Sequence, residues 1–222
     1  MTDTARMIEQ LSARAAPVRR LSSPLLRTLA WLSAALLVTA VIVMTHAGGA
    51  DWARLMESPD AIREWLASLL TGVLAGYAVF QVSVPGRDPR WAWLPAPAAL
   101  LWLASVGLGC MNDVARDGLS ALAFHAGPME CLRAISLTSI PLGLVLLLMV
   151  RHAGVVRPRP TALLAMLSAA ALSSSAVSLI HEGGESSLMV LLWHIGAVLV
   201  LSLVSWLFAR QMFGWIGYSR YA

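Results

Sequence analysis

The sequence predicts an all-α integral membrane protein with six transmembrane helices, both chain ends in the cytoplasm, and a short cytoplasmic amphipathic helix at the N-terminus. Three observations support this fold class: the composition, six long apolar stretches and the placement of arginine. Of 222 residues, 58% are hydrophobic and only 13% are charged, with a mean hydropathy of +0.72. Soluble domains carry about 25% charged residues. A soluble chain could therefore not bury this much apolar surface.

Six stretches are long enough to cross a membrane. A bilayer core of about 30 Å needs roughly 20 apolar residues, because an α-helix rises 1.5 Å per residue. The stretches are residues 28–44, 65–84, 91–111, 134–150, 161–180 and 186–209. The first could instead be a cleaved signal peptide, since small residues follow it, but the segment ahead of it is longer than an ordinary n-region. An uncleaved first span is therefore favoured.

Arginine predicts the orientation of these spans. Every basic residue in the chain is arginine, and most lie before the first span, in the segments 86–90 and 151–160, and after residue 209. The alternating segments are acidic or mixed. Because cytoplasmic loops are enriched in basic residues, both ends are expected inside the cell. We read the arginines as topology signals and expect no direct binding of nucleic acid.

The expected domains are a cytoplasmic arm, 1–24, a six-helix membrane domain, 25–211, and a short cytoplasmic tail, 212–222. In the arm, Ala5, Ile8, Leu11 and Ala15 recur at helical spacing, so a short amphipathic helix is predicted over 1–16, before Pro17. A second amphipathic helix is predicted on the outer membrane surface over 51–64. Gly72 and Gly76 form a small-xxx-small pair, which predicts close helix packing.

Signatures of catalysis are scarce. The chain has no nucleophile elbow, phosphate loop or HExxH motif, so we do not expect an enzyme. No charged residue falls in the middle of a span, where ion and proton pathways usually leave one. His194 lies within the sixth span, and we interpret it as an interhelical hydrogen-bonding residue. A transporter of small solutes or lipids, or a membrane assembly subunit, remains an alternative function.

The predicted topology gathers thiol, imidazole and carboxylate groups at the outer face. These residues are Cys110, Cys131, His125, His181 and Glu182. Such ligands suit Zn²⁺ or Cu⁺, and the two thiols could instead form a disulfide in a non-reducing compartment. For Cys131 the alternative is a small buried apolar residue. We expect no cofactor other than such a metal ion.

The order of segments resembles the NrsF-type membrane anti-sigma factors of proteobacteria over nearly the whole chain. The similar segments are Met7-Ile8-Glu9-Gln10-Leu11, then Pro17-Val18-Arg19-Arg20-Leu21, then Cys131-Leu132 through Ser139-Ile140-Pro141, and further stretches at 157–160 and 181–193. The resemblance implies a bacterial inner-membrane protein that holds an extracytoplasmic-function sigma factor at its cytoplasmic face and releases it under stress. It implies sigma binding by Met7, Ile8, Leu11, Pro17, Val18, Arg19, Arg20 and Leu21.

The resemblance also implies a periplasmic redox or metal signal. In the family, one sensing cysteine opens the fourth span and a second follows the histidine of the last outer turn. Cys131 matches the first, whereas His181 is followed here by Glu182. Two hypotheses follow. Cys110 could replace the missing cysteine, or Cys131 could form a metal site with His181 and Glu182.

Overall fold

The computed structural model describes residues 3–13, 21–45, 51–57, 59–122, 129–180 and 187–216, which are helical and contain no strand. In chain order the elements are α1 Asp3–Ala13, α2 Pro24–Thr45, α3 Trp52–Glu57, α4 Pro59–Val82, η1 Pro89–Trp93, α5 Ala96–Asp117, η2 Gly118–Leu122, α6 Met129–Val150, η3 Arg151–Ala153, α7 Pro158–Ile180, α8 Ser187–Val190, η4 Leu191–Ile195, α9 Gly196–Leu207 and α10 Ala209–Trp215.

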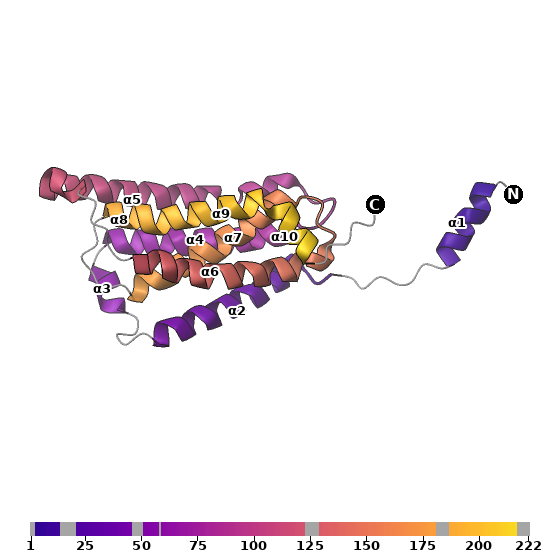
Figure 1. Ribbon diagram of the computed structural model, residues 1–222, viewed down its shortest axis with the longest axis horizontal. Coiled ribbons are helices and arrows are strands. Elements are labelled where there is room, and N and C mark those ends of the chain that lie inside the picture. Colours follow the sequence, from indigo (N-terminus) through magenta and orange to yellow (C-terminus); the bar gives the residue numbers. More distant parts are fainter. Residues whose placement is uncertain are drawn as a thin grey trace.

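Six helical segments of the described chain are long and apolar enough to cross a membrane, which confirms the prediction of an all-α membrane protein with six spans. They form one elongated bundle, and α1 projects from one of its ends (Figure 1). We call that end, where α2 and α7 begin and α4 and α6 finish, the arm end. The opposite end, where α4 begins and α5 finishes, is the distal end.

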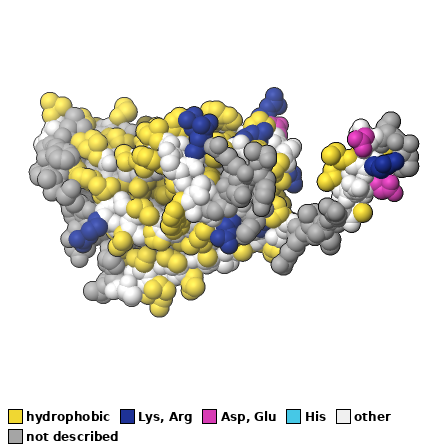
Figure 2. All heavy atoms as spheres, turned by 45° about the vertical axis from the view of Figure 1, so that its right-hand side comes forward, with side chains coloured by type: hydrophobic (Ala, Val, Ile, Leu, Met, Phe, Trp, Pro, Cys, Tyr) yellow, Lys and Arg dark blue, Asp and Glu magenta, His cyan; other side chains and the backbone are white. Residues whose placement is uncertain are grey.

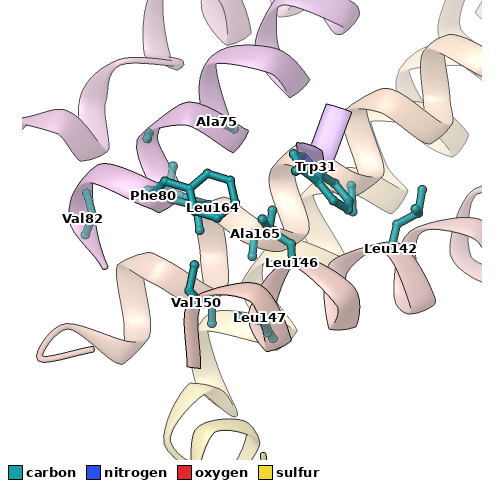
Figure 3. Packing of buried hydrophobic residues seen from close by; sticks show 14 of the residues in the cluster. Trp31, Ala75, Phe80, Val82, Leu142, Leu146, Leu147, Val150, Leu164 and Ala165 are labelled. Atoms are coloured by element: carbon teal, nitrogen blue, oxygen red, sulfur yellow. The ribbon is translucent and has the colours of Figure 1, made fainter. Parts of the chain in front are cut away.

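Helix α7 forms the centre of the bundle. It packs against α4, α6 and α9, and most of its side chains are buried. Its alanines and serines are small, so neighbouring helices can approach it closely. Larger side chains fill the space around it toward the arm end, among them Trp31, Phe80 and Leu146 (Figure 3). The Ala/Ser-rich composition of this fifth span therefore suits its central position.

The predicted glycine pair on α4 lies at a close approach to α7. A Cβ placed on Gly72 would lie 2.7 Å from Cγ of Leu172 and 3.2 Å from the backbone nitrogen of that residue. A Cβ on Gly76 would lie 3.0 Å from Oγ of Ser168. Any larger residue would push α4 and α7 apart. The small-xxx-small prediction is correct.

The segment predicted as one surface helix over 51–64 is divided in the structure. Helix α3 covers only Trp52–Glu57, and α4 begins at Pro59. Proline lacks a backbone N–H and is favoured in the first turn of a helix, so it starts a new helix and cannot continue the old one. Residues Asp60 to Glu64 therefore belong to the first turns of a spanning helix. The prediction of a single surface helix was wrong.

The sixth span is interrupted near its distal end. Residues Leu191–Ile195 form a π-helical turn between α8 and α9, a local widening that often marks functional positions. After Leu207 the chain turns at Phe208 into α10, whose Phe213 belongs to the main core cluster. The residues next to the expected boundary at 211 thus pack with the bundle.

Candidate functional site

The N-terminal arm presents an uncovered apolar face. Asp3 lies in the first turn of α1, where a negative charge interacts favourably with the helix dipole and stabilises the helix. Most residues that follow are good helix formers. Met7, Ile8 and Leu11 lie at helical spacing and are 65%, 63% and 67% exposed. Helix α1 stands apart from the bundle (Figure 1), and its hydrophobic side chains are open to the surroundings (Figure 2).

The rest of the predicted sigma-binding stretch is only partly described. Pro17, Val18, Arg19 and Arg20 lie outside the described residues. Leu21 is exposed and lies shortly before Pro24, where α2 begins. The structure therefore places Met7, Ile8, Leu11 and Leu21 on surfaces that a partner could reach.

The base of the arm is fixed to the bundle through Arg27. This residue is only 8% exposed. Its Nη2 donates a hydrogen bond to the carbonyl oxygen of Met149 at 2.9 Å, in the last turn of α6. Its guanidinium carbon lies 4.6 Å from the centre of the Phe80 ring, a cation–π geometry. One turn further along α2, Trp31 is fully buried. The start of α2 is thus held by α4, α6 and α7.

Charge is distributed unequally between the two ends. The described charged residues at the arm end of the bundle are Arg27, Arg87, Asp88, Arg90, Arg151, Arg157, Arg159 and Arg210. Figure 2 shows arginines near the end from which α1 projects and hydrophobic side chains over the flank. At the distal end, acidic residues such as Asp60, Glu64 and Asp113 mix with arginines. Basic residues thus gather at one end of the bundle, and charges of both signs mix at the other.

The distal end brings Cys110 into an acidic surrounding. Cys110 lies on α5 and is partly exposed. The carboxylates of Glu64, on α4, and Asp113, on α5, are close enough to act electrostatically on its thiol and on each other. Oδ2 of Asp113 accepts a hydrogen bond from the backbone N–H of Ser187 at 2.8 Å. Asp113 therefore joins the end of α5 to the start of α8.

The structure does not describe the side chains of the other predicted sensing residues. Cys131 lies in the first turn of α6, but its side chain is outside the described part, as are His125, His181 and Glu182. Among the residues that the structure does describe, no group of three histidine, cysteine or acidic residues could hold a metal ion. The pairing of Cys110 with Cys131 and the metal site both stay predictions.

Sequence reasoning did not connect Glu64 and Asp113 with Cys110. Each of the two acids stands in a segment of mixed charge just beyond a predicted span. The signal in the sequence for their neighbourhood with Cys110 was the predicted topology, which put both acids at the outer face. It could not show which helix ends are neighbours, because that depends on the packing of the bundle.

His194 has the role that the sequence predicted. It is buried in the π-helical turn, and its Nδ1 lies 2.9 Å from Oγ of Ser174 on α7. The hydrogen bond links the sixth span to the central helix. Interhelical bonds of this kind stabilise helix pairs in membranes.

One family model, described as NrsF, negative regulator of sigma F, matches residues 11–215. No significant match was found among curated proteins or among solved structures. The matched region begins inside α1 at Leu11 and ends at Trp215, the last residue of α10. It thus contains every candidate membrane span.

Proposed function

Because the chain belongs to the NrsF family of negative regulators of sigma F, we propose that it is a membrane-embedded anti-sigma factor that sequesters an extracytoplasmic-function sigma factor through its N-terminal arm. The observation that supports this mode of action is the uncovered apolar face of α1. Three large apolar side chains on one short exposed helix are typical of a helix that docks into a partner's groove.

The proposal also gives a role to the positive charge at the arm end. The arm end is rich in arginine and poor in acid, and Arg19 and Arg20 precede α2. A basic arm end attracts an acidic protein surface and increases the rate of association. The same arginines favour a cytoplasmic arm end, where a sigma factor would be available. The proposed location is the bacterial inner membrane.

A pair of variants on α1 tests the proposal in the full-length chain. Leu11→Asp introduces a charge into the apolar face, whereas Gln10→Asp introduces the same charge on the neighbouring, already polar position. Loss of one anchor in a helix-in-groove interface costs about 2 kcal/mol or more, roughly a 30-fold weaker complex. We expect Leu11→Asp to lose a co-expressed sigma factor during membrane purification and to derepress its reporter promoter.

Gln10→Asp should retain the sigma factor and repression. Equal retention by both variants at equal protein levels would contradict docking through α1. A third outcome is informative as well. If Leu11→Asp releases α1 from lipid vesicles but leaves sigma retention intact, the apolar face binds the membrane surface instead.

We propose further that the distal end receives a periplasmic redox or metal signal, with Cys131 as the central residue. Cys110 could pair with it, or His181 and Glu182 could complete a metal site, since these residue types bind soft or borderline metals. His125 is the remaining candidate ligand. Induction measured in Cys131→Ser, Cys110→Ser and the double variant separates these routes. Unchanged induction in all three would exclude thiol chemistry as the signal.

Two other classes of function find less support. A groove between α2 and the rest of the bundle is lined almost wholly by apolar side chains. This lining does not favour transport of a polar solute. A membrane assembly subunit would need a stable membrane partner. Co-purification in mild detergent tests for such a partner directly.

A further inference from the structure

An apolar groove opens between α2 and the rest of the bundle. It encloses about 530 Å³, a volume in the range of small-molecule sites. Its walls are the distal half of α2, the single residue Trp52 of α3, and parts of α4 and α7. Figure 1 shows the cause: α2 lies against the bundle at the arm end and diverges from it toward the distal end.

The burial of α2 agrees with this divergence. Its buried residues are Arg27, Thr28, Trp31 and Ala35, and none of the residues after Ala35 is buried. Side chains of the distal half, such as Leu36 and Met44, are strongly exposed although they line the groove. The described protein therefore does not fill the space between this half of α2 and helices α4 and α7.

The lining offers little to a polar occupant. It contains no charged residue, and its two hydroxyl groups are already used within their own helices. Thr39 donates to the carbonyl oxygen of Ala35 at 2.9 Å, and Ser175 donates to that of Leu172 at 2.8 Å. A headgroup or a polar solute would find few partners in these walls. The lining therefore suits an apolar chain.

Two tryptophans mark the distal end of the groove. Trp52 and Trp65 pack edge to face with ring centroids 5.8 Å apart, and Nε1 of Trp65 donates to the carbonyl oxygen of Ser175 at 3.0 Å. Tryptophan is enriched at the level of lipid headgroups. A lipid whose headgroup lies at this level would direct its tail along the groove toward the arm end.

The groove is continuous with the surface that faces lipid. Val41 and Leu37 on the outer side of α2 are exposed and apolar, so bilayer lipid surrounds the helix. We propose that the groove binds the acyl chain of a phospholipid from the leaflet at the distal end, and that this chain holds the distal half of α2 away from α4 and α7.

A lipid chain in the groove would set the tilt of α2, and through it the position of the arm. Helix α2 is fixed at the arm end and leads directly to Leu21 and the arm, so a change in its tilt changes how the arm leaves the bundle. This consequence for regulation rests on the proposed function of the arm. The binding site itself does not, and it is tested without a sigma factor.

The experiment uses the full chain in phosphatidylcholine vesicles that contain a trace of phosphatidylcholine with a photoactivatable acyl tail. After irradiation, labelled residues are mapped by mass spectrometry. We expect preferential labelling of groove-lining residues of α2, α4 and α7. Ala40→Trp, which fills the groove, should reduce this labelling severalfold, whereas Val41→Trp on the opposite side of α2 should leave it unchanged.

Three results would overturn the proposal. They are uniform labelling of the whole flank, an equal effect of the two tryptophans, and a groove protected from labelling, as a second copy of the chain seated in it would cause. If Ala40→Trp does not fold, the pair Ala40→Asn and Val41→Asn makes the same comparison, because a buried amide without partners also repels an acyl chain. Sigma binding enters none of these measurements, so failure here is distinct from failure of the proposed function.

Discussion

Nε1 of Trp31 donates a hydrogen bond to Oγ of Ser168 at 3.2 Å, and the same hydroxyl donates to the carbonyl oxygen of Gly72 at 2.7 Å. One serine thereby joins α2, α4 and α7 at a fully buried position. The contact lies just on the arm-end side of the point where α2 leaves the bundle. In the proposal for the groove, this contact is the fixed point about which the distal half of α2 tilts.

Removal of this hydroxyl should destabilise the bundle. We predict that Ser168→Ala costs about 1–2 kcal/mol, because the buried indole N–H loses its acceptor. Unfolding in mixed micelles with increasing dodecyl sulfate measures the difference. Ser33→Ala, an exposed serine on α2, is the control and should change little. Equal stability of the two variants would show that the Trp31 indole finds another acceptor.

The glycine pair on α4 allows a second test of stability, in which a group is added to the packed interface and none is removed. Gly72→Ala places a methyl group against Leu172, and overpacking of this kind costs about 1–3 kcal/mol. Gly107→Ala makes the same substitution in α5, where an added Cβ meets nothing within 4 Å, and the better helix propensity of alanine should leave it neutral or slightly stabilised. The same unfolding assay compares the pair. A loss of stability in Gly107→Ala as large as that in Gly72→Ala would contradict the packing argument.

The sequence was sufficient for the spans, the glycine contact and the role of His194, because each depends on local composition or on spacing along one helix. It failed where structure depends on a single backbone restriction or on packing between distant segments. Pro59 divided the predicted surface helix, and the π-helical turn around His194 has no compositional signal. Glu64 and Asp113 meet near Cys110 only because α4 and α5 are neighbours, which no spacing in the sequence reveals.

Variants of Arg27 and Arg90 separate the contribution of buried contacts to stability from the contribution of surface charge. Arg27→Ala removes the hydrogen bond to Met149 and the contact with Phe80, and we expect a loss of about 2 kcal/mol. Arg90→Ala removes one positive charge from the same end of the bundle but from an exposed side chain, so its effect should stay within about 0.5 kcal/mol. Both variants change the arm-end charge equally. Thermal unfolding of the purified variants therefore measures the contribution of the buried contacts.

The function of Arg27 can be measured in the same pair. If Arg27 fixes the base of the arm, its loss should weaken repression of the sigma-dependent reporter, while Arg90→Ala should repress normally. Similar repression by both variants at equal membrane levels would show that the arm works independently of this anchor. In that case a tilt of α2 could not control the arm.

Asp113 allows a final test of how the distal end is held together. Its carboxylate accepts the hydrogen bond from the Ser187 N–H, but it also repels Glu64. Asp113→Ala removes the acceptor and should cost about 1 kcal/mol, as for a lost helix cap. Asp113→Asn retains an acceptor and removes the repulsion, so it should be at least as stable as the parent. The exposed acid of the next turn, in Asp117→Ala, serves as the matched control.

The same variants report on Cys110 when Cys131→Ser is present in the background, so that a single thiol remains. If Asp113 holds α8 against α5 beside Cys110, its loss should open the distal end and increase the rate at which a maleimide alkylates that thiol. Asp113→Asn removes the same charge beside the thiol but keeps an acceptor for the Ser187 N–H, so it should react more slowly than Asp113→Ala, and Asp117→Ala should react at the parent rate. Equal rates in Asp113→Ala and Asp113→Asn would mean that the bond to Ser187 does not control access to Cys110.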